Sequence, residues 1–259
     1  MKFSVSIHAS LNAKDLSTAD KIRKSAELGF PAFELWTWWN EDVDEVSRVA
    51  KENGIEIGSV CTKFVSLVDP SMREAYLTGL RESIAAARRL GCRYLISQTG
   101  DVIPGSSRAD QATSLIGGLK AAAPLLEEAG ITLVVEPLNT LVDHPGYFLE
   151  KADEAADLVR AVGSPNVKML YDVYHQQVTE GDLIRTIRRH REEIAYFHIA
   201  DHPGRHEIGT GEIHYANVLQ AIKDTGYDGY IGLEYFPKGD AEFALRKFME
   251  QFGPLMRGE

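Results

Sequence analysis

The chain is poor in cysteine: it contains only Cys61 and Cys92, and they form no Cys-x-x-Cys pair. This scarcity excludes a disulfide framework and predicts two buried free thiols in a reducing cytoplasm. The sequence also lacks any apolar run near the ~20 residues that a membrane helix needs, and its start alternates apolar and polar residues like a strand. We therefore expect a cytoplasmic protein that binds no membrane.

Basic residues are also scarce, with 28 Lys and Arg against 38 Asp and Glu, which gives a formal net charge of −10. Phosphate binding depends on clustered basic side chains, so this balance disfavours nucleic acid as a partner. One local basic run, residues 185–191, is interleaved with Ile184 and Ile187. It indicates the solvated face of an amphipathic helix.

A glycine-rich turn is missing after the first predicted strand, where a doubly wound dinucleotide-binding sheet would usually carry one. Instead, strand-like runs alternate with helical patterns along the whole chain, and several of these patterns end at Gly. The predicted strands are 3–7, 32–36, 55–60, 94–97, 131–135, 167–171, 194–197 and 230–233. The predicted helices are 15–28, 42–52, 71–90, 108–129, 149–162, 182–193, 214–225 and 240–252. This order predicts an α/β protein with one domain over residues 1–259, a (β/α)₈ TIM barrel.

Four potential metal ligands stand where predicted strands end: Glu136, Asp172, His198 and Glu234. They are 36, 26 and 36 residues apart, about the length of one strand-helix unit, so parallel strands would bring them to one end of the barrel. A single acid at a strand end is more simply a helix cap or a solvated carboxylate. Four at matching positions favour a metal site. Three carboxylates and one imidazole suit one divalent ion, Mn²⁺ or Mg²⁺ first, with Co²⁺ or Zn²⁺ as alternatives.

Other polar residues follow the strands and are candidates for substrate binding. His175 could hold a substrate oxygen or support the ligands, or it could be a neutral histidine packed under a helix. Arg205, in a glycine-bearing loop, is the predicted clamp for a carboxylate or hydroxyl pair. Lys63 and Gln98 are expected at the same mouth, although either could simply be solvated. We assign no role to His8, Glu34, His202, His206 or the predicted aromatic cluster of Trp36, Trp38 and Trp39.

Four segments carry a family resemblance: 134–140 (VVEPLNT), 171–175 (YDVYH), 198–213 (HIADHPGRHEIGTGEI) and 232–235 (GLEY). With them the chain resembles the hydroxypyruvate isomerase family of the xylose-isomerase-like barrels. The resemblance implies Glu136, Asp172, His198 and Glu234 as ligands of one metal, the two glutamates as proton-transferring groups, and His175 and Arg205 as holders of substrate oxygens. Many hydroxypyruvate isomerases carry Gln where His198 stands, whereas the related epimerases carry His.

These observations predict a metal-dependent isomerase that moves a proton between neighbouring carbons of a small hydroxy-carbonyl compound through a cis-enediolate. Conversion of hydroxypyruvate to tartronate semialdehyde is the first expectation. A ketose 3-epimerase or an aldose-ketose sugar isomerase is the alternative reaction, and a non-catalytic binding or accessory subunit is the alternative of another class. A homo-oligomer is left open.

Overall fold

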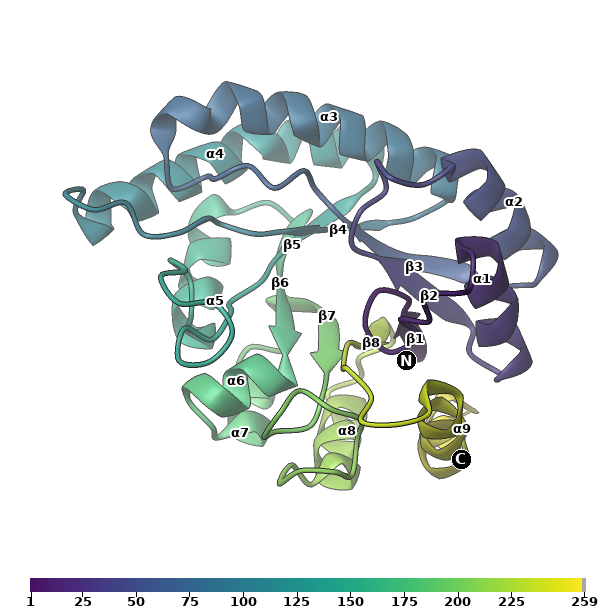
Figure 1. The fold of residues 1–259 in the computed structure, drawn as a ribbon. Helices are drawn as coiled ribbons and strands as arrows, with labels where there is room; N and C mark the ends of the chain where they lie inside the picture. Colours follow the sequence, from purple (N-terminus) through teal and green to yellow (C-terminus); the bar gives the residue numbers. More distant parts are fainter. Residues whose placement is uncertain (258–259) are drawn as a thin grey trace.

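The computed structural model describes residues 1–257, and its centre is a closed barrel of eight parallel strands in sequence order (Figure 1). β1 closes the barrel by pairing with both β2 and β8. The (β/α)₈ prediction is thus confirmed, with each strand within one or two residues of its expected bounds. The strands are β1 (Lys2–Ser6), β2 (Ala32–Leu35), β3 (Glu56–Cys61), β4 (Tyr94–Ser97), β5 (Thr132–Val135), β6 (Val167–Asp172), β7 (Ile194–Ile199) and β8 (Tyr230–Leu233).

The helices surround the strands in Figure 1, and the two ends of the chain lie near each other there. The α-helices are α1 (Thr18–Glu27), α2 (Val43–Glu52), α3 (Arg73–Leu90), α4 (Arg108–Ala129), α5 (Ala152–Val162), α6 (Val173–Thr179), α7 (Leu183–Arg189), α8 (Tyr215–Asp224) and α9 (Ala241–Phe252). Two short 3₁₀ helices, η1 (Pro70–Met72) and η2 (Gly253–Arg257), complete the described elements. No helix within residues 1–257 combines the length and apolarity needed to cross a membrane.

The connection from β6 to β7 differs from the prediction because it contains two helices. The sequence pattern predicted one helix over 182–193, but α6 begins directly after β6, with Asp172 as its N-cap, and α7 ends at Arg189. Gly181 has φ +66° and separates the two helices. The predicted start of the preceding helix, residue 149, was also early, since α5 begins at Ala152. Predicted C-terminal glycines at Gly91 and Gly130 do adopt the left-handed conformation.

The alternation of side chains along each strand determines which residues reach the barrel mouth. A small buried cluster, Cys61, Ile96, Val134, Leu170 and Tyr196, is separate from the larger core between strands and helices. It fills the inside of the barrel. Side chains two positions further along a strand point to the same side. The inside of the mouth is therefore lined by residues two positions after these apolar ones, among them Gln98, Glu136, Asp172 and His198.

Candidate metal centre and active site

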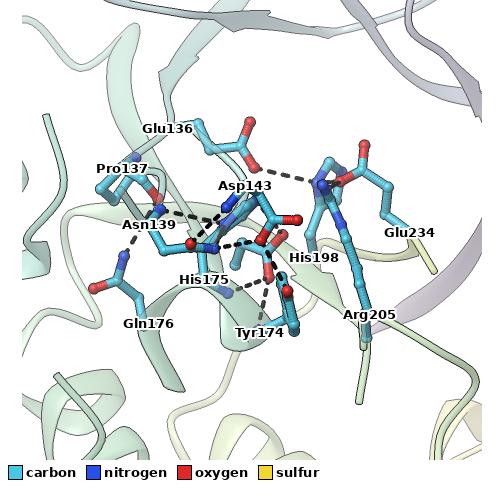
Figure 2. Close-up of polar contacts among 12 residues, drawn as sticks. Glu136, Pro137, Asn139, Asp143, Tyr174, His175, Gln176, His198, Arg205 and Glu234 are labelled. Carbon is cyan, nitrogen blue, oxygen red and sulfur yellow. Dashed lines mark hydrogen bonds and ion pairs between the residues drawn. The ribbon is translucent and has the colours of Figure 1, made fainter. Parts of the chain in front are cut away.

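The structure brings the four predicted metal ligands together at the C-terminal end of the barrel. Glu136 follows β5, Asp172 ends β6, His198 is in β7 and Glu234 follows β8. Each offers one ligand atom, and these atoms all lie within 4.8 Å of one another. All four side chains are buried. Figure 2 shows Glu136, His198 and Glu234 directed toward one another.

Two of these residues lie inside their strands rather than just after them, which corrects the predicted strand ends. β6 extends to Asp172 and β7 to Ile199, because Asp172 and His198 are paired neighbours in the parallel ladder. Asp172 also caps the N-terminus of α6, because its Oδ1 accepts hydrogen bonds from the backbone N–H groups of Tyr174 and His175 at 2.7 and 3.2 Å. Its Oδ2 is left for the site.

The site contains buried polar atoms that the described protein groups do not satisfy. Glu136 Oε1, Asp172 Oδ2 and His198 Nδ1 are each inaccessible to solvent and without a hydrogen-bond partner. Burial raises the pKa of Asp172 to about 7, and the nearby Glu136 carboxylate adds to this effect against the opposing charge of Arg205. Unpaired buried carboxylates are unfavourable unless a cation accompanies them. This oxygen-rich donor set therefore fits a divalent cation.

His198 has carboxylates on both sides of its ring. Nδ1 lies 3.5 Å from Glu136 Oε1 and 3.4 Å from Glu234 Oε2. Nε2 lies 3.2 Å from Glu34 Oε1. Burial alone would lower the pKa of His198, but Glu234 and Glu34 raise it well above the ordinary value. The ring thus supplies positive charge to this acidic cluster when no metal is bound.

Glu234 is held through both of its oxygens. The Trp36 indole N–H donates to Oε1 at 2.6 Å, and the Arg205 guanidinium donates to Oε2 at 2.5 Å. Burial would raise the pKa of Glu234, but the positive charges of His198 and Arg205 hold it well below its usual range. Glu234 therefore stays ionised and fixed in orientation.

Arg205 reaches the site from the loop between β7 and α8, where it has φ +54°. Asp201, fully buried, holds this loop by accepting four backbone N–H groups. Its Oδ1 accepts from His202 and Ile213, and its Oδ2 accepts from Gly209 and Gly211. The glycines of the 209–211 turn thus bind the protein's own carboxylate. Arg205 Nε remains buried and without a partner, available to a ligand.

His175 is a fully buried neutral histidine that also faces the ligands. Asn139 donates to its Nδ1 from the backbone N–H at 3.3 Å and from the side-chain amide at 2.6 Å. Burial and the charge of Arg205 lower the pKa of His175 well below its ordinary value. With Nδ1 accepting, the proton is on Nε2, which lies 3.7 Å from Asp172 Oδ2. His175 is thus packed and neutral, and its Nε2–H faces Asp172; its role in holding a substrate oxygen stays a prediction.

Two adjoining cavities open from the candidate metal centre. The inner one, about 150 Å³, is lined by Glu136, His198, Arg205 and Glu234 among others. The outer one, about 450 Å³, extends over the loops after β3, β4 and β5. Phe64, Gln98, Leu138 and His144 line both, so the cavities are continuous. Gln98 stands where the sequence predicted it, and its Oε1 is buried without a partner.

Lys63 is the one predicted site residue that the structure does not bring to the others. Its Nζ lies 2.6 Å from Glu82 Oε2 and 5.5 Å from the centre of the Trp38 ring. Among the described residues that line the two cavities, Lys63 does not occur. Strand alternation would turn Lys63 inward two positions after Cys61, but β3 ends at Cys61 and the alternation ends with it.

Several residues of this site received no role from the sequence. Trp36 separates from the predicted tryptophan cluster and stacks on His8, whereas Trp38 and Trp39 pack near Phe64 at the rim. Glu34 is buried inside the barrel. His202 and His206 stay in the Arg205 loop, where His206 Nδ1 lies 2.7 Å from the Phe236 carbonyl oxygen. The alternation of side chains along β2 could have indicated Glu34 and Trp36, because it directs both side chains to the inside of the barrel, where the candidate metal ligands lie.

The comparisons with known proteins agree with this geometry. The profile of the xylose isomerase-like TIM barrel family matches residues 22–252. Hydroxypyruvate isomerase from Escherichia coli (strain K12) is 31% identical over 235 residues, which cover 87% of this chain and 90% of that enzyme. The 2-oxo-tetronate isomerase of Cupriavidus necator is 33% identical over 174 residues, which cover 67% of this chain and 66% of that enzyme.

Among solved structures, AP endonuclease, family 2 from Brucella melitensis superposes with a TM-score of 0.90 and is 28% identical, with 98% of each chain covered. Together these similarities confirm the resemblance that the four sequence segments predicted.

Proposed function

Because this chain belongs to the xylose isomerase-like TIM barrel family, we propose that it is a metal-dependent isomerase of a small hydroxy-carbonyl compound, with hydroxypyruvate as substrate and tartronate semialdehyde as product. Its hydroxypyruvate isomerase relatives support the isomerase class over a non-catalytic barrel. The observation that carries the proposal is the convergence of three buried carboxylates and His198 around unsatisfied ligand atoms. A divalent cation at this site would polarise the substrate carbonyl and stabilise negative charge that develops on its oxygen.

The two glutamates have different surroundings, and these suit different tasks. Glu136 Oε1 is buried and has no hydrogen-bond partner, so one oxygen of this carboxylate can hold the metal while the other removes the proton from the hydroxymethyl carbon. Glu234 comes from β8, three strands away around the barrel from β5, and is ionised before the reaction. It takes the proton of the hydroxyl group that becomes the product aldehyde and returns it to the neighbouring carbon, while Glu136 passes its proton to the oxygen on that carbon, so both carboxylates end ionised. Trp36 and Arg205 fix the Glu234 carboxylate during this transfer.

The remaining residues bind and orient the substrate. His175 presents Nε2–H, and Gln98 presents an unsatisfied amide oxygen in the cavity wall. Arg205 is the cation available to a substrate carboxylate, through its unpartnered Nε. The inner cavity of about 150 Å³ is small beside the roughly 300–1,000 Å³ that drug-sized ligands occupy, which suits a three-carbon acid.

A second candidate is an isomerase or 3-epimerase of a longer ketose or sugar acid, and the outer cavity favours it. This cavity of about 450 Å³ would be unused by a three-carbon substrate. Its described lining contains no Lys or Arg but offers Ser66, Asp101 and His144. Such groups suit an uncharged hydroxylated chain.

Elemental analysis and solvent-deuterium exchange would test both candidates together. The protein is stripped with chelator, reloaded with single metals and offered hydroxypyruvate, four-carbon sugar acids and ketoses in D₂O. We expect metal-dependent deuterium incorporation at the isomerised carbons. Unchanged turnover by fully demetallated protein would reject the proposal, and kcat/KM higher for ketoses than for any small keto acid would select the second candidate.

Nucleic acid is not proposed as a substrate, because the net charge is −10 and the described chain contains one cluster of four residues that could hold a metal ion. The likeness to the Brucella protein named an AP endonuclease makes a direct assay necessary. Metal-dependent nicking of abasic-site DNA by pure protein, lost in Glu136→Gln, would contradict this reading.

A further inference from the structure

A second buried carboxylate system lies on the inner side of His198, away from the substrate cavities. Glu34, in β2, is 1% exposed, and its Oε1 is 3.2 Å from His198 Nε2. Both atoms are buried and neither has a hydrogen-bond partner among the described residues, so the contact is an ion-pair distance within reach of a hydrogen bond. The other ring nitrogen, Nδ1, faces Glu136 and Glu234 at 3.5 and 3.4 Å. The imidazole is therefore placed between the Glu34 carboxylate and the ligand cluster.

The second oxygen of Glu34 is already occupied. The Tyr196 hydroxyl donates to Oε2 at 2.6 Å, and the Ser59 hydroxyl lies 3.3 Å from the same atom. Burial and the adjacent Glu34 charge raise the pKa of Tyr196 well above its usual value, so the phenol remains a donor. Oε2 is thus fixed from β7 and β3, and Oε1 is directed to His198.

Two strand glycines provide the space for this arrangement. A Cβ at Gly232 would overlap Glu34 Oε1 and lie 2.7 Å from His198 Cδ2. A Cβ at Gly58 would lie 2.6 Å from the Tyr196 hydroxyl oxygen. Neither glycine has a positive φ, so the reason for glycine at these positions is the close approach of the buried polar groups.

We propose that Glu34 is a positioning residue of the metal centre: it accepts Nε2–H of His198 and so directs the Nδ1 lone pair toward the metal. A neutral imidazole has one N–H and one acceptor nitrogen, and a ligand histidine binds metal through the acceptor. A carboxylate on the far nitrogen also makes the ligand nitrogen more basic. The inference rests on the metal site proposed above and adds a residue that does not touch the metal or substrate.

Metal binding to Glu34→Gln tests this directly, without turnover. The amide keeps the size of the side chain but removes its charge. Calorimetric titration with Mn²⁺ should give a Kd about 10–100-fold weaker than that of the wild type. In the Mg²⁺-loaded protein, long-range ¹⁵N–¹H spectra of the histidines should show a single Nε2–H form of His198 in the wild type and a mixture in the variant.

Glu56→Gln is the matched control, because Glu56 also accepts a tyrosine hydroxyl, that of Tyr230, but near the opposite end of the barrel. Its Mn²⁺ Kd should equal that of the wild type. Tyr196→Phe keeps Glu34 but removes the hydroxyl that donates to its Oε2. We expect this variant to weaken Mn²⁺ binding by a factor of about 2–10. If Glu34→Gln does not fold, Tyr196→Phe tests the positioning role of Glu34. Wild-type Kd in the folded variants would overturn the role of Glu34. Failure of the wild type itself to bind Mn²⁺ or Mg²⁺ would instead reject the metal site proposed above.

Discussion

Trp36 and Glu234 are 198 residues apart in sequence, yet the indole N–H of Trp36 donates to Glu234 Oε1 at 2.6 Å. The contact joins the end of β2 to the end of β8, past β1, which lies between these two strands. With Arg205 on Oε2, it leaves neither Glu234 oxygen free to rotate away. Trp36 also stacks on His8, with ring centres 5.6 Å apart. One tryptophan thus orients a candidate metal ligand and forms a wall of the inner cavity.

Trp36→Phe should retain the stacking surface but lose this hydrogen bond. A hydrogen bond to a charged group contributes about 1.5–3 kcal/mol, so we expect kcat/KM to fall by roughly 10–100-fold. Trp39→Phe is the control, since Trp39 packs against Phe64 at the rim and lines neither cavity among the described residues. Steady-state kinetics of both variants on the same substrate measure the difference. Equal, small effects would show that the hydrogen bond does not orient Glu234.

Asp201→Asn should disturb the Arg205 loop without touching the substrate. The amide NH₂ would face two of the four backbone N–H groups that now donate to the carboxylate. Loss of these bonds in a buried position costs about 1–3 kcal/mol, which corresponds to a Tm lower by roughly 2–12 °C. Glu212→Gln, an exposed change in the same loop, should leave Tm unchanged. A calorimetric scan in which both variants match the wild type would contradict the loop-holding role.

The fold could be predicted because its signals are local. Buried parallel strands appear as apolar runs, and glycines such as Gly91 and Gly130 mark helix ends with a backbone conformation that other residues avoid. The sequence did not predict the α6 helix because it is only 7 residues long and its N-cap, Asp172, is also the last residue of β6, so no loop separates the two elements. The structure shows the capping role on Oδ1 and leaves Oδ2 without a partner, as the proposed metal site needs.

The candidate ligand set could be predicted because strand ends converge in any parallel barrel. The residues around it could not, because they depend on contacts between distant strands. Trp36 meets Glu234, and Glu34 meets His198, only through the closure of the barrel. Lys63 was placed wrongly because it lies in the loop after β3, where strand alternation no longer fixes the direction of a side chain. Its side chain is instead held by the ion pair with Glu82 of α3.

Removal of the metal should abolish turnover and lower stability. Without a cation, Glu136 and Asp172 remain buried with unsatisfied oxygens. A metal at 100 times its Kd would add about 2.7 kcal/mol to the free energy of unfolding. We expect chelation to lower Tm, and Mn²⁺ or Mg²⁺ to restore both Tm and activity, with Co²⁺ and Zn²⁺ compared alongside. Full activity in protein shown by elemental analysis to be metal-free would reject the mechanism.

Glu136→Gln and Glu234→Gln should each abolish turnover, because an amide can offer a metal its oxygen but cannot accept the substrate proton. At least one variant should still bind substrate, which calorimetry can measure. Exchange of the substrate C–H with solvent deuterium separates the two roles, since the variant that lacks the first base should show no exchange. Near wild-type exchange in both variants would contradict the assignment of either glutamate as a base.

The last prediction separates the two cations considered as substrate anchors. Lys63 is paired with Glu82 on a partly exposed surface, and such pairs contribute about 0–1 kcal/mol, so Lys63→Ala should change KM for hydroxypyruvate by less than about threefold. Arg205 lines the inner cavity beside Glu234, so Arg205→Gln should lower kcat for every substrate.

Arg205→Gln should also lower kcat/KM for hydroxypyruvate at least about tenfold more than for a neutral ketose, because only the acid loses a charge-assisted hydrogen bond. Kinetics of both variants on an acid and a ketose measure this ratio. A tenfold rise in KM for the acid alone in Lys63→Ala would instead restore the anchor that the sequence predicted. That result would mean that Lys63 leaves Glu82 and turns to the mouth when substrate binds.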